Sequence, residues 1–143
     1  MDVEELKVKW TGWSFDEIHF EIESGPLVEF AESCGEILKR YTDPEDPDFQ
    51  AVPSYTASFH GHRQLPEGFP MERERSFDGG KCVEWKAPIR PGDRIVARSH
   101  IHDIFSKTGR SGGMMFVVHR MEFRNQDEVL VAIVDWKMIQ QLG

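Results

Sequence analysis

A carboxylate and a phenol stand five residues apart in the segment CGEILKRYTDP, where Glu36 is followed by Tyr41. Two such groups at the end of a helix could both reach one water molecule, and the carboxylate could accept a proton from it. A phenol is a poor base at neutral pH, because its ordinary pKa is about 10. The segment is therefore either an acid–base site or the remains of one.

A second group of residues has the chemistry of a phosphate site. It combines two cations, one hydroxyl and the backbone N–H groups of two glycines, which together could hold an anion. Its members are Lys107, Arg110, Ser111, Gly112 and Gly113. The spacing is not that of a P-loop. A hairpin turn with solvated charges explains the same residues equally well, so both interpretations stay open.

The charge of the chain is unevenly distributed. The formal net charge is −8, yet residues 73–124 contain 11 basic and 6 acidic side chains, whereas residues 1–72 contain 5 basic and 16 acidic ones. The negative total argues against nucleic acid as a partner, because nucleic-acid-binding proteins present basic surfaces. The basic middle segment suits an anionic ligand such as the phosphates of coenzyme A, although attraction between two parts of one fold explains the distribution equally well.

Two histidine pairs are the candidates for metal ligands, namely His60 with His62 and His100 with His102. Side chains two residues apart share one face of a strand but diverge on a helix or a loop, and the first pair lies in such a region. Neither pair has a third ligand at a recognisable spacing. We therefore expect no metal site.

The length and composition indicate one domain spanning residues 1–143. No apolar run approaches the roughly 20 residues of a membrane span, and the first residues are charged where a signal peptide would be apolar. The sequence thus predicts a cytoplasmic protein without membrane contact. Cys34 and Cys82 share no metal-type spacing and are too few for a disulfide framework, so we expect both to be reduced, buried thiols.

The first half of the chain contains a strand, a helix and irregular segments. Residues 14–23 alternate apolar and charged side chains, which predicts a half-buried strand. The triplet Ser-Gly-Pro at 24–26 suits a helix start, and apolar residues at helical spacing predict a helix that ends within residues 36–40. Three prolines make residues 42–53 a surface loop. We expect a short helix over residues 53–64.

The second half of the chain has a period of two, which predicts strands joined by tight turns. The expected strands cover residues 83–89, 94–106, 114–123 and 130–138. Consecutive hairpins form an antiparallel sheet, and the amphipathic helices must pack against it, so the fold class is α+β. Val131 and Ile133 are apolar on the side of the last strand that faces away from the core, and we expect them to contact another chain.

Five motifs resemble, in their order and spacing, those of MaoC-like acyl-CoA dehydratases and hydratases, in particular the N-terminal-type half domain of that family. They are VEFAESCGE (28–36), YTDP (41–44), AVPSY (51–55), RPGDR (90–94) and GRSGGMMFVV (109–118). None is specific alone, but together they cover most of the chain from about Trp13 to Ile139. The resemblance implies a hot-dog fold, in which an antiparallel β-sheet is wrapped around a central helix, as a single domain over residues 1–143.

The resemblance also supplies a motif with which Glu36 and Tyr41 can be compared. In catalytic members of the family, a motif of the form Asp-x-Asn-Pro-x-His is implied to activate water for addition to an enoyl thioester. At the four motif positions this sequence has Glu36, Leu38, Lys39 and Tyr41, so only the carboxylate keeps its type. Leu38 cannot make the hydrogen bonds of an asparagine. We interpret Glu36 and Tyr41 as degenerate catalytic positions, against the alternative of a variant site in which Tyr41 donates a proton.

The function that the resemblance implies is that of an acyl-CoA-binding subunit, non-catalytic or weakly catalytic, of an enoyl-CoA hydratase or 3-hydroxyacyl dehydratase. Its ligand would be an acyl-CoA thioester, with coenzyme A entering as part of the substrate and no separate cofactor. A homodimer, or a heterodimer with a catalytic MaoC-like subunit, would complete it. The alternatives are a stand-alone hydratase or acyl-CoA thioesterase, and an acyl-binding module without turnover. The acyl chain and the direction of reaction stay open.

Overall fold

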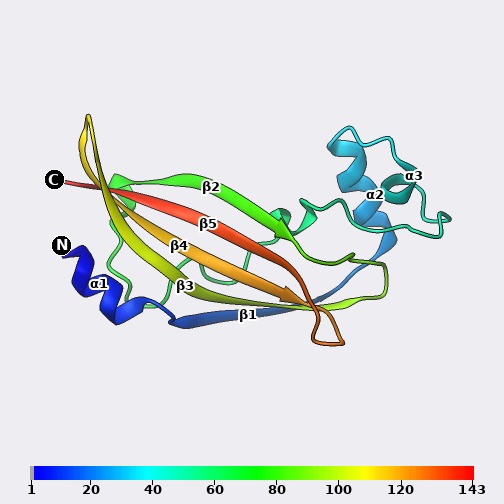
Figure 1. The fold of residues 1–143 in the computed structure, drawn as a ribbon, viewed down its shortest axis with the longest axis horizontal. Helices are drawn as coiled ribbons and strands as arrows, with labels where there is room; N and C mark the ends of the chain where they lie inside the picture. The colour runs from blue at the N-terminus through cyan, green and yellow to red at the C-terminus, as the bar shows by residue number, and fades with distance from the viewer. Residues whose placement is uncertain (1) are drawn as a thin grey trace.

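The computed structural model describes residues 2–143, and its centre is a five-stranded antiparallel sheet with the strand order β1-β3-β4-β5-β2 (Figure 1). The strands are β1 (Ser14–Glu21), β2 (Ser76–Trp85), β3 (Arg94–Gly109), β4 (Gly112–Arg124) and β5 (Leu130–Leu142). The helices of the described chain are α1 (Val3–Trp10), α2 (Ser24–Ser33), α3 (Lys39–Thr42) and the short 3-10 helices η1 (Tyr55–Ser58) and η2 (Arg73–Arg75). The predicted α+β class with antiparallel pairing is confirmed.

The central strands follow the period of two that the sequence shows. Buried side chains alternate along the first part of β3, at Ile95, Ala97, Ser99 and Ile101. Arg98, between two of them, is exposed. The register shifts between Ile101 and Asp103, and this bulge keeps Ile104 on the buried side. One face of the sheet, the inner face, is therefore buried along most of its length.

Helix α1 is formed by a stretch that the sequence analysis noted only for its charge. The carboxylate of Asp2 caps it by accepting the backbone N–H groups of Glu4 and Glu5. Acidic side chains in its first turn and lysines in its last turn match the helix dipole. Its last residue, Trp10, is 4% exposed and packs edge-on against Phe69 with 5.4 Å between ring centroids. The N-terminal segment is thus part of the core.

Helix α2 begins where the sequence predicts but ends earlier. Leu27 and Ala31 form its buried face, and Leu27 belongs to the core cluster at one end of the sheet. Gly35 then takes a φ of +77°, a conformation that glycine adopts at little cost, and the helix stops at Ser33. Figure 1 shows α2 and α3 together beside that end of the sheet. We call residues 24–50 the α2–α3 lobe.

Both cysteines are exposed, so the expectation of buried thiols is wrong. Cys34 follows the last residue of α2, and the early end of that helix leaves it outside the buried face. Cys82 lies on β2, an edge strand of the sheet, opposite Asp135 of β5. Asp135 pairs with Arg120, which shows that this part of the sheet presents polar groups.

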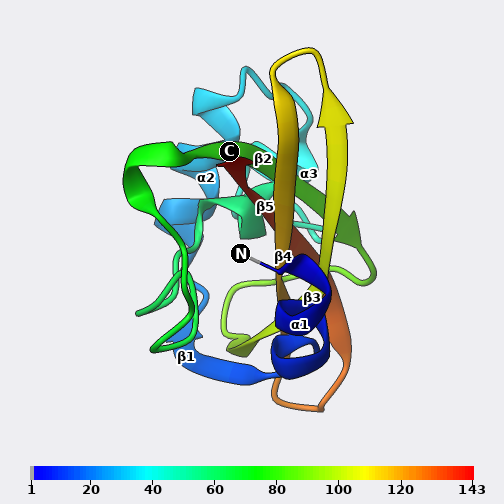
Figure 2. The same ribbon diagram turned by 90° about the vertical axis from the view of Figure 1, so that its left-hand side faces the viewer.

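The chain between the α2–α3 lobe and β2 covers the inner face without long helices (Figure 2). The loop predicted over residues 42–53 is largely irregular. The short helix expected over residues 53–64 is reduced to the single 3-10 turn η1, and the rest of that segment is irregular. The backbone N–H of Ala51 donates to the carbonyl of Ile89, which anchors the chain to the connection between β2 and β3.

Val131 lies in the core, so the expectation that it faces outward is wrong. It is 0% exposed and belongs to the same cluster as Ala132 and Val134. The cause is an irregularity in the β4–β5 pairing, where Phe123 is opposite Ala132 and the next pair joins Arg124 to Leu130. Val131 is thereby left between pairs and turns inward.

We expect Val131→Lys to destabilise the fold by about 3–5 kcal/mol, because it would place an unpaired charge in the core. Ile133→Lys is the matched control. Ile133 is half-buried and lies opposite Glu84 and Glu122, so a lysine there has carboxylates nearby. Urea unfolding of both variants measures the difference. Equal losses of unfolding free energy would contradict the assignment of Val131 to the core.

Candidate functional site

Glu36 lies on the short connection between α2 and α3, and Tyr41 lies within α3. The backbone N–H of Glu36 donates to the Ala31 carbonyl at 2.9 Å, and that of Tyr41 donates to the Leu38 carbonyl at 3.0 Å. Both side chains are half-buried. Within the described residues no hydrogen bond joins them, and Tyr41 instead carries the Arg40 guanidinium over its ring at 5.4 Å. The two groups share a loop but do not form a linked acid–base pair.

The four residues between them, 37–40, are all exposed. Leu38 is 46% exposed and Ile37 is 88% exposed. An asparagine at the position of Leu38 could orient a reacting group, and a leucine cannot. The loop is nevertheless held in place, because the N–H of Gln50 donates to the Arg40 carbonyl and Arg90 forms an ion pair with Asp48 at 3.0 Å. The segment is thus held in a defined position, and what it lacks for orienting a reacting group is a polar side chain at position 38.

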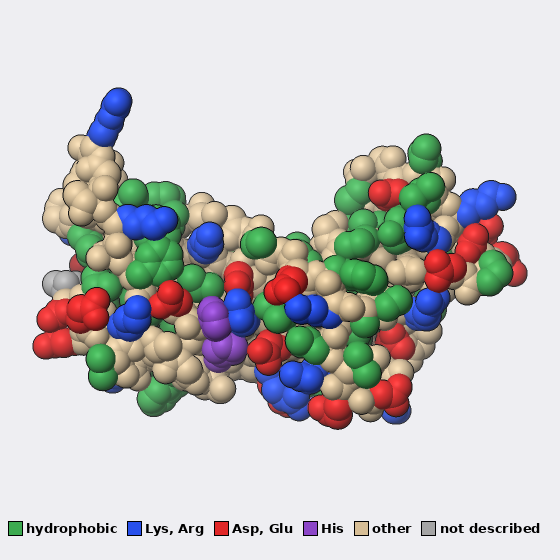
Figure 3. Space-filling view, viewed as in Figure 1, with side chains coloured by type: hydrophobic (Ala, Val, Ile, Leu, Met, Phe, Trp, Pro, Cys, Tyr) green, Lys and Arg blue, Asp and Glu red, His purple; other side chains and the backbone are tan. Residues whose placement is uncertain are grey.

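The predicted phosphate site is a tight hairpin between β3 and β4. Arg110 and Ser111 form the two-residue turn, and both are exposed. Gly112 is opposite Gly109 and Gly113 is opposite Thr108 in the ladder, so the glycines belong to paired strands rather than to an open loop. The hairpin projects from the body of the protein with a basic side chain at its tip (Figure 3).

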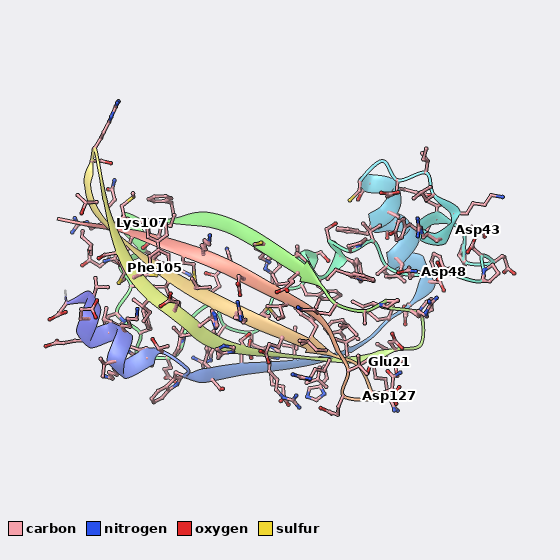
Figure 4. The ribbon with its side chains drawn as sticks, in the orientation of Figure 1. Glu21, Asp43, Asp48, Phe105, Lys107 and Asp127 are labelled. Atoms are coloured by element: carbon pink, nitrogen blue, oxygen red, sulfur yellow. The ribbon has the colours of Figure 1, made fainter. Side chains whose placement is uncertain are left out.

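Lys107 lies on the face of the sheet rather than at the turn. Its ammonium group lies over the rings of Phe105 and Phe116, at 5.6 and 5.5 Å from their centroids. The two rings are stacked with centroids 5.0 Å apart. Figure 4 shows Lys107 and Phe105 at the opposite end of the molecule from Asp43 and Asp48. The hairpin and the Glu36–Tyr41 loop are therefore not brought together within one chain.

The structure contains a cavity of about 770 Å³ that the sequence analysis did not identify. It lies between residues 60–73 and the facing parts of β2 and β5. Its lining includes apolar, basic and acidic side chains, among them Leu65, Phe69, Arg63, Arg73, Asp78 and Trp136. His60 and His62 also line it, so the first histidine pair belongs to this cavity. A sequence signal did exist, because two successive glycines inside a strand indicate a bulge or a close approach.

Those glycines shape the bulge in β2 that borders the cavity. The register of β2 against β5 shifts between Asp78 and Lys81. A side chain on Gly79 would lie 2.9 Å from the Lys137 carbonyl oxygen, so the sheet excludes one there. Gly80 has a φ of +90°. The bulge thus requires both glycines, and it aims Asp78 and Lys81 at the same tryptophan.

Trp136 is the centre of a polar network at the bulge. Its indole N–H donates to Asp78 at 2.8 Å, and the ammonium group of Lys81 lies 4.8 Å from its ring centroid. The N–H of Gly80 and the indole N–H both lower the pKa of Asp78. Burial lowers the pKa of Lys81 against the opposing charge of Asp78. Lys81 also donates to the Ala57 carbonyl at 2.9 Å and so fixes the start of the segment that covers the cavity.

A buried histidine lies behind the wall of the cavity. His119 of β4 is 1% exposed, and neither ring nitrogen makes a hydrogen bond of normal geometry in the described structure. Its ring contacts Phe15 with centroids 4.8 Å apart and lies opposite Trp136. Burial lowers the pKa of His119 to about 4, against the raising effect of Asp16 and of the Gln64 backbone. The imidazole is therefore neutral at neutral pH.

Among residues 2–143, no group of three or more His, Cys, Asp or Glu side chains is arranged to hold a metal ion. His100 and His102 lie with ring centroids 5.6 Å apart on the outer part of β3. No helix of the described chain is long and apolar enough to cross a membrane.

The sequence matches the model of the family described as "FAS1-like, dehydratase domain region" over residues 9–134. A curated relative, the UPF0336 protein SCO4636 of Streptomyces coelicolor, is 30% identical over 100 residues, which cover 63% of this chain and 67% of that protein. The family match extends over most of the sheet and the α2–α3 lobe.

The fold is similar to those of solved dehydratases. The MaoC-like dehydratase of Rhodospirillum rubrum aligns with a TM-score of 0.64 at 20% identity, covering 100% of this chain and 98% of that one. The HadBC (3R-hydroxyacyl-ACP dehydratase) complex of Mycobacterium tuberculosis aligns with a TM-score of 0.67 at 18% identity, covering 97% and 98%. The predicted hot-dog fold and the MaoC-like resemblance are confirmed.

The buried histidine should make stability depend on pH. The pKa of His119 is about 4 in the folded chain and about 6.5 in the unfolded chain, so between these values only the unfolded chain binds the proton. The part of the unfolding free energy that depends on a neutral His119 is therefore fully present above pH 6.5, and it is lost as the pH falls toward 4. At pH 4.5 the loss should be about 2–3 kcal/mol relative to pH 7.

His119→Leu should remove this part of the pH dependence, and His102→Leu, which replaces an exposed histidine, is the control. Urea unfolding of the three proteins at pH 7 and pH 4.5 separates the histidine from the carboxylates, which titrate in all of them. An unchanged difference between the two pH values in His119→Leu would show that this residue is not the cause.

Proposed function

Because this chain belongs to the FAS1-like, dehydratase domain region family, we propose that it is an acyl-CoA-binding subunit of an enoyl-CoA hydratase or 3-hydroxyacyl dehydratase, itself non-catalytic or weakly catalytic. The observation that carries the proposal is the Glu36–Tyr41 loop. Glu36 keeps the carboxylate of the family motif, but Glu36 and Tyr41 make no hydrogen bond to each other in the described structure. Leu38 stands at the motif position that has an asparagine in catalytic members. A partner chain then supplies the catalytic pair.

The arrangement of the sheet supports an assembly of two such units. β2 is an edge strand, and Phe77 and Trp85 on it are 50% and 43% exposed. An open edge with exposed aromatic side chains favours pairing with another strand. If two β2 strands pair antiparallel about a two-fold axis, the hairpin end of one chain lies beside the α2–α3 end of the other. The partner is a second copy or a catalytic MaoC-like subunit in the cytoplasm.

The hairpin is our proposed contact for the coenzyme. Arg110 and the Ser111 hydroxyl are exposed at its tip and Lys107 adds a charge, while Gly112 and Gly113 allow the tight turn. The acyl-CoA would therefore span the two units, with its phosphates on one chain and its thioester near the motif loop of the other. A stand-alone hydratase is the alternative, since Glu36 retains the carboxylate that such an enzyme would need as a base.

Glu36→Gln and Tyr41→Phe should each leave the hydratase activity of the complete assembly within a few-fold of the parent. Removing a true general acid or base usually lowers the rate by about a hundredfold to ten-thousandfold, so the two outcomes are well separated. Hydration of crotonyl-CoA is measured for the chain alone and with a dehydratase from the same genome that carries an intact Asp-x-Asn-Pro-x-His motif. Light scattering establishes which species is present.

A large loss of rate in either variant, at an unchanged melting temperature, would make this chain the catalyst and favour the alternative. If the chain alone is as active as the mixed assembly, this chain is also the catalyst. Inactivity of both the chain and every mixture would refute the proposal.

Arg110→Ala should weaken the binding of coenzyme A by about tenfold to a hundredfold, because a charge-assisted contact is lost. Binding to the parent should also weaken as salt concentration rises. Arg98→Ala is the control, since Arg98 is exposed but already paired with Glu17 at 2.8 Å. Calorimetric titration measures both. If the two variants bind coenzyme A equally, the hairpin is a solvated turn.

A further inference from the structure

The cavity beneath residues 60–73 has no role in the proposed function. Its volume of about 770 Å³ lies within the range of about 300–1,000 Å³ that is typical of small-molecule sites. None of the residues assigned above to catalysis or coenzyme binding lines it. We define residues 57–73, which cover it, as the roof segment.

The charge of the cavity lining is opposite to that of the protein. The chain has a net charge of −8, yet the permanently charged residues of the lining are Arg63, Arg73 and one acid, Asp78. The carboxylate of Asp78 accepts the indole N–H of Trp136 and the N–H of Gly80 through one oxygen, and no ion pair joins it to either arginine in the described structure. Two cations against one anion leave a net positive charge. The lining is therefore electropositive.

The two guanidinium groups differ in how well they are paired. Arg63 has a loose contact with Glu67 at 3.8 Å. Arg73 makes no ion pair within the described residues, whereas Arg75, two residues later and outside the lining, pairs with Glu72 at 3.7 Å. Arg73 thus lines the cavity as an exposed arginine whose guanidinium makes no ion pair in the described structure. A guanidinium of this kind binds a carboxylate through two parallel hydrogen bonds.

The rest of the lining is mixed, with six apolar residues beside His60, Gly61, His62, Gln64 and Ser76. Leu65, Phe69 and Met71 come from the roof segment, and Trp136 and Met138 come from β5. Phe69 is 9% exposed and Met138 is 7% exposed, so this part of the wall is also packed into the protein. A small anion that contacted only the arginines would bury no apolar surface against these side chains. A ligand with an apolar body would bury surface against them.

The roof is anchored at three places, which keeps the cavity open in a defined shape. The N–H of Glu72 donates to the side-chain oxygen of Gln140 at 2.7 Å, and the N–H of Arg63 donates to Asp16 at 3.1 Å. Lys81 holds the Ala57 carbonyl at 2.9 Å. A site fixed in this way loses little entropy when a ligand binds.

We propose that this cavity binds a carboxylate carried on an apolar chain or ring, with Arg73 as the main contact of the carboxylate and Arg63 as a supporting charge. A carboxylate fits better than a phosphate, because it places one small anionic group at one guanidinium and leaves an apolar body for Leu65 and Phe69. The site does not depend on the proposed function, since a chain that never contacts coenzyme A could still bind a free carboxylic acid.

The experiment titrates the purified chain with octanoate, 1-octanol and coenzyme A by calorimetry. Octanoate and 1-octanol have the same chain length, so their difference measures the carboxylate. We expect octanoate to bind the parent at least tenfold more tightly than 1-octanol does. Arg73→Gln should weaken octanoate binding by about tenfold or more and leave 1-octanol binding unchanged.

Arg75→Gln is the matched control, with the same charge change two residues away, and it should bind octanoate as the parent does. Arg110→Ala should also bind octanoate normally, which separates this site from the coenzyme contact. Equal binding of octanoate and 1-octanol, equal losses in Arg73→Gln and Arg75→Gln, or no octanoate binding at millimolar concentration would each overturn the proposal. If coenzyme A rather than octanoate depends on Arg73, the anion bound here is a phosphate and the proposal is wrong.

Discussion

The inner face of the sheet is much longer than the helix that packs on it, and the rest of the structure depends on this mismatch. β3 has 16 residues and α2 has 10. At about 3.3 Å per strand residue and 1.5 Å per helix residue, the strand is roughly three times as long as the helix. Leu27 therefore covers one end of the sheet, and a separate cluster forms at the other end, where Trp10 and Phe69 pack on β3 and β4.

Covering that second end with irregular chain has a cost in backbone hydrogen bonds, because such a chain cannot pair its own polar groups as a helix does. Side chains of the sheet make up part of the loss, as Gln140 and Asp16 accept N–H groups of the roof segment and Lys81 donates to a carbonyl of it. Polar groups are thereby drawn into a face that would otherwise be apolar. The same loose fit of irregular chain on a curved sheet leaves the cavity, and it leaves His119 buried beside it.

The sequence predicted the elements whose patterns are local. The alternation of Ile95, Ala97 and Ile101 located β3, and the Ser-Gly-Pro start located α2. Prediction failed where a single backbone feature overrode the pattern: the bulge beside Val131 turned an expected outer residue into the core, and Gly35 ended α2 before Cys34. Helix α1 was missed although Asp2 followed by two glutamates is a capping signal.

The cavity could not be predicted, because it depends on where an irregular segment crosses the sheet. Nothing in the sequence near Arg73 indicates that this arginine lines the same cavity as Trp136 while Arg75 pairs with Glu72. The strand predicted from residue 83 begins at Ser76 instead, so the bulge at Gly79 and Gly80 lies outside the predicted element. The candidate site at Glu36 and Tyr41 was locatable from its motif alone, and the structure added that the two side chains are not linked.

The two ends of the molecule are built from different elements, so a substitution at one end can leave the contacts of the other end unaltered. The motif loop depends on α2, Gly35 and α3, whereas the cavity depends on the roof segment, the β2 bulge and β5. A substitution such as a leucine at position 38 alters the chemistry of the loop without touching Asp78, Lys81 or Trp136. Loss of catalytic residue types at one end is therefore physically compatible with an intact, electropositive cavity at the other. A fold of this kind can lose a reaction and keep a binding site, because the two are held by separate sets of contacts.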